Sequence, residues 1–156
     1  MILAIDPGLK GALVWMAEDD NLGHPIVDIL DMPTIKIRDR DTVDAHTVLA
    51  AVQARTARLV VIERVETRPG NGAVAALKTG YGGGLLQGVM IGAGIPHMMV
   101  LAKTWKNKAG VPADKGECRA MAQRLWPDSA HLFKRVKDDG RADAALLARW
   151  AITSHL

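Results

Sequence analysis

Four carboxylates stand at the expected ends of secondary-structure elements, where an acidic side chain can take part in chemistry. Asp6 and Glu63 each end an unbroken apolar run, and Asp139 and Asp143 lie near the start of the C-terminal helical pattern. Burying an ionised carboxylate is costly unless a hydrogen bond or a cation compensates it. Asp6 before Pro-Gly also suits a turn, and Asp139 suits a helix cap. Neither role explains Asp143, which shares a helix face with the apolar residues that follow it.

The types of these side chains favour a metal ion over a covalent nucleophile. The chain has one cysteine and five histidines, and no Ser-His or Cys-His pattern or histidine ligand spacing is present. Carboxylates without histidine or cysteine suit a hard cation such as Mg²⁺ or Mn²⁺. Two such ions can stabilise both the attacking water and the leaving oxygen of a phosphodiester. We therefore expect the four carboxylates to hold two divalent cations in one catalytic site.

Positive charge is concentrated in one segment of the chain. Residues 103–141 carry ten lysines and arginines against five acidic residues, whereas residues 1–102 carry nine against eleven. A cationic segment on an otherwise acidic domain indicates a polyanion partner such as a nucleic acid backbone, although a solvated lysine-rich surface has the same composition. We expect DNA contacts from four basic residues of this segment, namely Lys106, Lys108, Lys115 and Arg141.

An α/β arrangement must position these side chains. Apolar runs and turn signals predict an antiparallel meander followed by two further strands parallel to each other, at residues 2–5, 11–16, 25–32, 59–63 and 96–101. Helical spacing predicts a helix capped by Asp44, a helix over 73–94, a helix capped by Asp114 and a last helix over 142–155. Residues 33–41 and 103–115 are expected to be loops, and 129–137 a connector.

Glycines recur every fourth residue in the second of these helices, at positions 80, 84, 88 and 92. Each glycine costs roughly 1 kcal/mol in a helix relative to alanine, so four in register need a packing reason. A ridge without side chains allows another backbone to come close. That neighbour is either the domain's own sheet or the same helix of a second copy across a two-fold axis.

Length and composition bound the remaining possibilities. The 156 residues suffice for one domain, which we expect to span 1–156. The single cysteine excludes an internal disulfide, and no signal peptide is visible, so we expect a cytoplasmic protein. No charge occurs from residue 79 to 102, but Gln87, Pro96 and His97 argue against a membrane span there.

The ordered motifs resemble those of a known family across nearly the whole chain. Ile-Asp6-Pro-Gly, Val-Ile-Glu63, Trp105-Lys106, Asp114-Lys115 and Asp139-Gly-Arg-Ala-Asp143-Ala are similar to the motifs of RuvC Holliday junction resolvases, and most similar to short phage or prophage members. The resemblance implies a ribonuclease H-like fold, with a mixed five-stranded sheet flanked by helices. It also implies a bacterial or phage-encoded homodimer that cuts four-way DNA junctions using Mg²⁺.

By motif position, Asp6, Glu63 and Asp143 resemble the family's metal ligands, and Lys106 and Lys115 its phosphate contacts, with Lys115 also assisting the chemical step. The family often spaces its last two aspartates by three residues, which would place one at Gly140. Asp139 is therefore the expected fourth ligand, with Asp138 as the alternative. The loop after Glu63 also lacks the aromatic residue that several relatives stack on junction bases.

Two other functions share these motifs. Another ribonuclease H-like nuclease, acting on RNA–DNA hybrids or on flap DNA, would use the same carboxylates. A non-catalytic junction-binding protein would keep the fold and the basic segment without the metal. The resemblance favours a crossover junction endodeoxyribonuclease over both.

Overall fold

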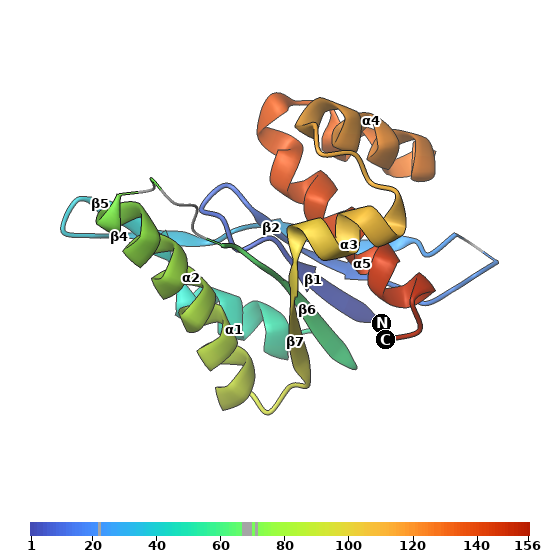
Figure 1. The fold of residues 1–156 in the computed structure, drawn as a ribbon. Coiled ribbons are helices and arrows are strands. Elements are labelled where there is room, and N and C mark those ends of the chain that lie inside the picture. The colour runs from blue at the N-terminus through green and yellow to red at the C-terminus, as the bar shows by residue number, and fades with distance from the viewer. Residues whose placement is uncertain (22, 67–69, 71) are drawn as a thin grey trace.

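A five-stranded mixed sheet forms the centre of the molecule, in the order β3-β2-β1-β6-β7 (Figure 1). The computed structural model describes residues 1–21, 23–66, 70 and 72–156. The strands of the sheet are β1 (Ile2–Ile5), β2 (Ala12–Met16), β3 (Ile26–Asp31), β6 (Leu59–Arg64) and β7 (His97–Leu101). β1, β2 and β3 are antiparallel neighbours, whereas β6 runs parallel to β1 and β7 parallel to β6. The predicted mixed five-stranded sheet is confirmed.

Helices cover both faces of this sheet. One face carries α1 (Ala45–Gln53) and α2 (Ala73–Gly92), and the other carries α3 (Ala102–Ala109), α4 (Lys115–Leu125) and α5 (Asp139–Thr153). Alternate residues of each strand face opposite layers. In β1, Leu3 packs in the core beneath α1 and α2, and Ala4 packs in the core beneath α5. β1 is therefore buried on both faces, as its unbroken apolar run predicts.

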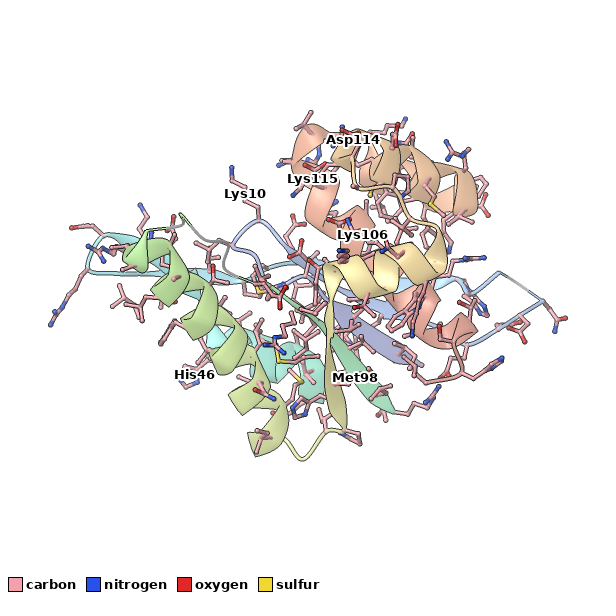
Figure 2. All side chains as sticks on the ribbon, in the orientation of Figure 1. Lys10, His46, Met98, Lys106, Asp114 and Lys115 are labelled. Atoms are coloured by element: carbon pink, nitrogen blue, oxygen red, sulfur yellow. The ribbon has the colours of Figure 1, made fainter. Side chains whose placement is uncertain are left out.

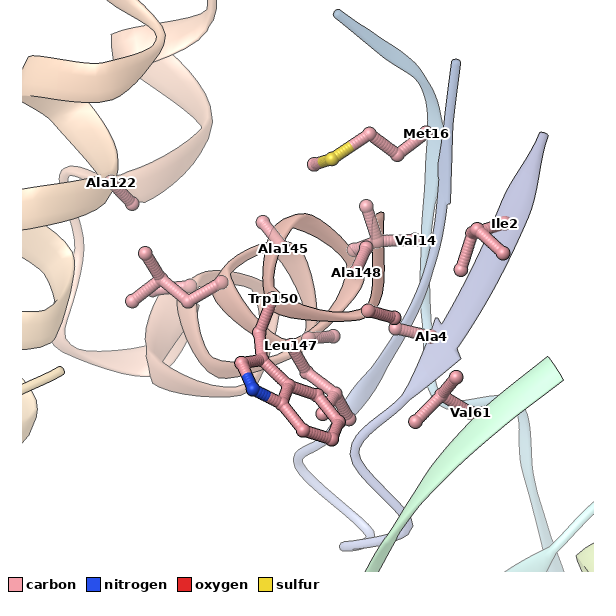
Figure 3. Close-up of a cluster of buried hydrophobic side chains, with 14 of the residues drawn as sticks. Ile2, Ala4, Val14, Met16, Val61, Ala122, Ala145, Leu147, Ala148 and Trp150 are labelled. Atoms are coloured by element: carbon pink, nitrogen blue, oxygen red, sulfur yellow. The ribbon is translucent and has the colours of Figure 1, made fainter. Parts of the chain in front are cut away.

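Alanines bring α5 close to the sheet. Figure 3 shows Ala145 and Ala148 of α5 facing Val14 and Ala4 of the sheet. Small side chains on both sides let the helix approach the strands, and Trp150 fills the remaining space at the rim of the core. This packing fixes the position of the N-terminal turn of α5, which carries two of the four carboxylates.

Glycines make the turn between β1 and β2 fit beneath α5. A Cβ added to Gly11 would lie 2.1 Å from the carbonyl oxygen of Asp6, and one added to Gly140 would lie 2.4 Å from the carbonyl oxygen of Lys10. Real side chains never approach a backbone atom this closely. The first turn of α5 therefore rests directly on the turn that follows Asp6.

Several expected loops have regular structure. Residues 33–41 were expected to be a loop, but they contribute to a two-stranded hairpin of β4 (Thr34–Ile37) and β5 (Arg40–Val43). Its turn residues Arg38 and Asp39 have φ values of 47° and 61°, a conformation for which glycine or asparagine is the usual signal. The charged residues at alternate positions hid the strand periodicity, and the turn lacks that signal.

The helix boundaries differ from the predictions in a similar way. The expected basic loop over 103–115 contains α3, which ends at Gly110 with a φ of 63°. The expected connector forms two short 3₁₀ helices, Pro127–Phe133 and Val136–Asp138, and α5 then begins at Asp139 instead of at Ala142. The predicted caps at Asp44 and Asp114 are confirmed, since each side chain accepts hydrogen bonds from backbone N–H groups in the first turn of its helix.

The glycine ridge of α2 faces away from the sheet. A Cβ added to Gly80, Gly84, Gly88 or Gly92 would meet nothing within 4 Å. Packing of the ridge on the domain's own sheet is therefore wrong as an explanation of its spacing. Gly82 and Gly83 face inward instead, toward Pro7 and Met99. Within the described part of the chain, no helix is both long and apolar enough to cross a membrane.

Candidate active site

Asp6 and Glu63 are neighbours at one edge of the sheet. β1 and β6 are parallel and pair Ile5 with Ile62, so the residue that follows each lies at the same end of the two strands. Asp143 lies in the first turns of α5 above this edge and is 8% exposed. Its charge raises the pKa of both Asp6 and Glu63. Three of the predicted ligands therefore form one electrostatic cluster.

Asp6 is held by the turn that follows it. The backbone N–H of Gly8 donates a hydrogen bond of 3.0 Å to Oδ1 of Asp6. Burial raises the pKa of Asp6, and the negative charge of Asp143 raises it further, whereas the Gly8 N–H and the charges of Lys115 and Lys106 oppose the rise. The carboxylate is thus partly shielded from water while two cations and two other acids surround it.

Glu63 is oriented by a buried indole. Nε1 of Trp105, in α3, donates a hydrogen bond of 2.9 Å to Oε2 of Glu63. Burial and, to a smaller extent, the charges of Asp6 and Asp143 raise the pKa of Glu63 to about 7. The hydrogen bond from Trp105 opposes this rise. A glutamate with a pKa near neutrality inside an acidic cluster is a frequent sign of a functional site.

Lys106 holds Asp143 in place. Nζ of Lys106 lies 2.8 Å from Oδ1 of Asp143, and both side chains are largely buried. Burial lowers the pKa of Lys106, but the hydrogen bond to Asp143 and the negative charges around it together outweigh burial, so the net pKa is raised. Nζ also lies 3.8 Å from Sγ of Cys118. The structure therefore gives Lys106 a carboxylate partner inside the cluster, where the sequence predicted a contact with phosphate.

Asp139 and Asp138 have different surroundings. Asp139 is paired with Arg119 of α4 and lines a cavity together with Asp6. Asp138 is 1% exposed and accepts hydrogen bonds from the backbone N–H and the guanidinium of Arg135. Burial raises the pKa of Asp138, but the bonds from Arg135 outweigh this and lower it overall. Asp138 is thus committed to the fold, and Asp139 is the better candidate for the fourth ligand.

The cavity beside the carboxylates has a basic rim. It has a volume of about 760 Å³, and its lining includes Asp6, Lys10, Lys115, Lys137 and Asp139. Figure 2 shows Lys10, Lys106 and Lys115 around the same end of the sheet. A rim of lysines around an acidic floor can hold a phosphate next to a metal site.

Lys10 and Arg119 were missed by sequence reasoning. Lys10 lies in the turn after Asp6, far in sequence from the basic segment, and its proximity to Asp6 was the available signal. Arg119 lies four residues after Lys115 on α4, a spacing that places both on one helix face. Helix spacing could therefore have found it.

Two predicted DNA contacts lie elsewhere. Lys108 is exposed on α3 and lines neither the carboxylate cavity nor the smaller cavity beside it. It lies two residues after Lys106, about 200° around α3 from the face that points toward the carboxylates, and its contact with DNA stays a prediction. Arg141 makes a bidentate ion pair with Asp31, at 2.5 and 2.7 Å. Its donors are engaged within the protein, which argues against a direct role in DNA binding.

The donor chemistry fits a hard divalent cation, although the carboxylates are not gathered tightly around one point. Among the described residues, no group of three or more His, Cys, Asp or Glu side chains is arranged to hold a metal ion. Lys106 and Arg119 instead neutralise Asp143 and Asp139. Neighbouring carboxylates that raise one another's pKa repel each other when ionised, and a bound cation would stabilise their ionised forms. Metal ligation by Asp6, Glu63, Asp139 and Asp143 stays a prediction.

Comparison with known sequences yields one curated relative. No protein-family model matches the chain. The chain is 33% identical over 86 residues to "Holliday junction resolvase MOC1, chloroplastic" of Chlamydomonas reinhardtii. The match covers 54% of this chain and 10% of the relative, so the chain spans only a small part of that relative's length.

Comparison with solved structures gives matches over nearly the whole chain. The structure described as T. thermophilus RuvC in complex with Holliday junction substrate has a TM-score of 0.67 and 17% sequence identity, and the match covers 99% of this chain and 94% of that one. A further Thermus thermophilus RuvC structure has a TM-score of 0.60 and 18% identity, over 99% and 95% of the two chains. The two structural matches show the fold of the chain, and the sequence match is confined to 86 residues. The chain has the RuvC fold, of the ribonuclease H-like class.

Proposed function

We propose that the protein is a divalent-metal-dependent endonuclease that resolves four-way DNA junctions. The observation that carries the proposal is the cluster of Asp6, Glu63 and Asp143, whose charges raise the pKa of Asp6 and Glu63 next to a lysine-rimmed cavity. Burying carboxylates that repel one another destabilises the fold, and a cation bound by the cluster would offset that repulsion. The relatives are named as Holliday junction resolvases or as RuvC bound to such a junction, which supports four-way DNA as the substrate.

The residues of the cluster have separable roles in this proposal. Asp6, Glu63 and Asp143 would hold the cation, with Asp139 completing the set after exchange of its Arg119 partner. A divalent cation there stabilises negative charge on the attacking and leaving oxygens of a phosphodiester. We favour Mg²⁺, with Mn²⁺ as a substitute and two ions in the site.

Other groups position the carboxylates and the DNA. The Gly8 N–H and the Trp105 indole fix the orientations of Asp6 and Glu63. Lys115 lines the same cavity as Asp6 and would neutralise the phosphate being cut. Lys10 would contact a neighbouring phosphate. Such contacts position the backbone without reading sequence.

A second copy of the chain is the proposed partner at α2. The ridge of glycines is open, and Leu77 and Ile91, 73% and 65% exposed, lie along the same side of the helix. Exposed apolar residues beside a ridge without side chains suit a close helix pair. Two active sites in one dimer would address two strands of a junction. The whole of residues 1–156 would act as one nuclease domain, in a bacterial or phage-infected cytoplasm.

Cleavage of synthetic substrates tests the proposal. The full chain is incubated with four-way, flap, RNA–DNA hybrid and linear substrates, in Mg²⁺ and in chelator. We expect Mg²⁺-dependent cutting of the four-way substrate, loss of cutting but not of binding in Asp6→Asn, and wild-type cutting in the control Asp128→Asn, which changes an exposed aspartate of a 3₁₀ helix. Preference for hybrid or flap DNA would redirect the proposal to another nuclease activity. Junction binding without cutting by the wild type would leave only a binding protein.

A further inference from the structure

A second cavity lies on the other side of the turn that follows Asp6. It has a volume of about 200 Å³ and lies between this turn, β5 and α2. Gly8 and Leu9 line both this cavity and the larger one that contains Asp6. One short turn therefore separates the carboxylate cavity from a neighbouring hollow.

The lining of this smaller cavity is apolar and aromatic. Leu9, Val65 and Tyr81 all line it, although each is 43–55% exposed. Exposed apolar side chains that gather at one place mark a binding site more often than scattered ones do. Tyr81 is the only tyrosine in the chain, and Lys78 lies one turn before it on α2 in the same lining. An exposed ring, aliphatic walls and the Lys78 cation thus surround a single small hollow, whose lining also includes the carboxylate of Asp41 on β5.

The size of the hollow limits its occupant. About 200 Å³ lies below the roughly 300–1,000 Å³ typical of pockets for whole small-molecule ligands. It has room for one planar ring system and too little for a base pair. A nucleobase offers such a ring, and its stacking on an aromatic side chain tolerates any sequence. The phosphate next to that base would meet Lys78.

We propose that the cavity formed by Leu9, Val65, Lys78 and Tyr81 takes one unstacked nucleobase of the branched DNA, close to the strand held at Asp6. This inference rests on the proposed function and adds a residue that selects branched DNA. In a continuous duplex every base is stacked and paired, whereas a junction has strained bases at its crossover that cost little to displace. Tyr81 therefore distinguishes the branched substrate from a linear one.

Equilibrium DNA binding, measured in chelator so that no strand is cut, tests whether Tyr81 stacks on a base of branched DNA. For Tyr81→Leu we expect roughly five- to 150-fold weaker binding to the four-way junction, the range for loss of one base–aromatic stack, and little change on a linear duplex. Tyr81→Phe keeps the ring and should stay within about twofold of the wild type. Val27→Ala is the control, since Val27 on β3 is as exposed as Tyr81, at 55%, and lines neither cavity.

Junctions that carry one abasic nucleotide near the crossover then locate the base. At the position whose base enters the cavity, Tyr81→Leu should have no further effect, because the stack is already absent. Unchanged junction binding by Tyr81→Leu would overturn the inference, as would equal weakening on junction and duplex. A change in mass by light scattering would also overturn it and would assign Tyr81 to a subunit contact. Wild-type protein that neither binds nor cuts junctions would refute the proposed function itself, a result distinct from any of these.

Discussion

Glu63→Gln should make the protein more stable at pH 8. The folded state raises the pKa of Glu63 from 4.5 to about 7, mainly through burial and then through the charges of Asp6 and Asp143. At pH 8 the wild-type protein therefore carries a buried negative charge beside two others. Glutamine removes that charge and keeps an amide oxygen that can accept the hydrogen bond from Trp105.

The size of the effect follows from the pKa. The difference between the unfolded and folded pKa values of Glu63 corresponds to about 3 kcal/mol of stability, at roughly 1.4 kcal/mol per pKa unit. Solvent at the open side of the cavity and relaxation of the side chains reduce this, and we expect about 1–2 kcal/mol. For a chain of this length that is an increase in melting temperature of roughly 2–8 °C.

The sign of the pH dependence is fixed by linkage. A carboxyl group with a raised pKa binds its proton more tightly in the folded state, so its favourable contribution is complete below the unfolded pKa and is lost as the pH rises through the folded one. The wild type should therefore lose stability between about pH 4.5 and 7 relative to Glu63→Gln. Below that window the two proteins should melt together.

Thermal and urea unfolding across pH 4 to 9, in chelator and in Mg²⁺, provide the measurement. Mg²⁺ at pH 8 should stabilise the wild type more than Glu63→Gln, because only the wild type offers the full set of charges to the ion. Glu66→Gln, a change at an exposed loop residue three positions later, is the control and should match the wild type. The reasoning fails if Glu63→Gln is no more stable than the wild type at pH 8, or if its gain persists unchanged at pH 4.

Four further changes test the packing around the carboxylates. Gly140→Ala should destabilise the fold by about 2–4 kcal/mol in urea unfolding, because the added methyl group meets a backbone carbonyl oxygen at 2.4 Å. Asp138→Ala should lower stability by about 1–3 kcal/mol in the same assay, whereas Asp139→Ala should lower cleavage rate with a smaller change in stability. Lys106→Met should destabilise by about 3–5 kcal/mol by leaving Asp143 buried without its cation, and Mg²⁺ should restore part of this in thermal melting.

The parts of the fold that the sequence predicted are those with long, unambiguous patterns. Residues 2–5 in β1 and 59–62 in β6 are fully apolar and each is followed by a carboxylate, and the parallel pairing of the strands brings Asp6 and Glu63 together. Asp143 was placed correctly on the buried face of the last helix from its spacing alone. Helical caps at Asp44 and Asp114 were found because their side chains satisfy first-turn N–H groups. Each of these signals is local and needs no partner from elsewhere.

The remaining features depend on contacts that a sequence does not display. Lys106 faces Asp143 and Lys108 does not, which is decided by the rotation of α3 about the buried Trp105. Arg141 is neutralised by Asp31, 110 residues away in the chain. Charge composition alone does not distinguish Lys106, Lys108 and Arg141 as candidates for DNA contact. Their separation into a carboxylate partner, an exposed lysine and an internal ion pair came from tertiary packing.

The position of Gly140 explains why no acid stands where the motif pattern would place the fourth carboxylate. The motif pattern would place an aspartate there, but a Cβ at Gly140 would meet the backbone of both Lys10 and Gly11 at 2.4 to 2.9 Å. Only glycine lets the first turn of α5 rest on the turn that holds Asp6. The acid must then stand at a neighbouring position of the helix N-terminus. Asp138 is committed to Arg135 there, whereas Asp139 lines the cavity with Asp6. The close packing that brings Asp143 toward Asp6 therefore also excludes an acid at Gly140, and the prediction that Asp139 takes that role requires it to leave its partner Arg119.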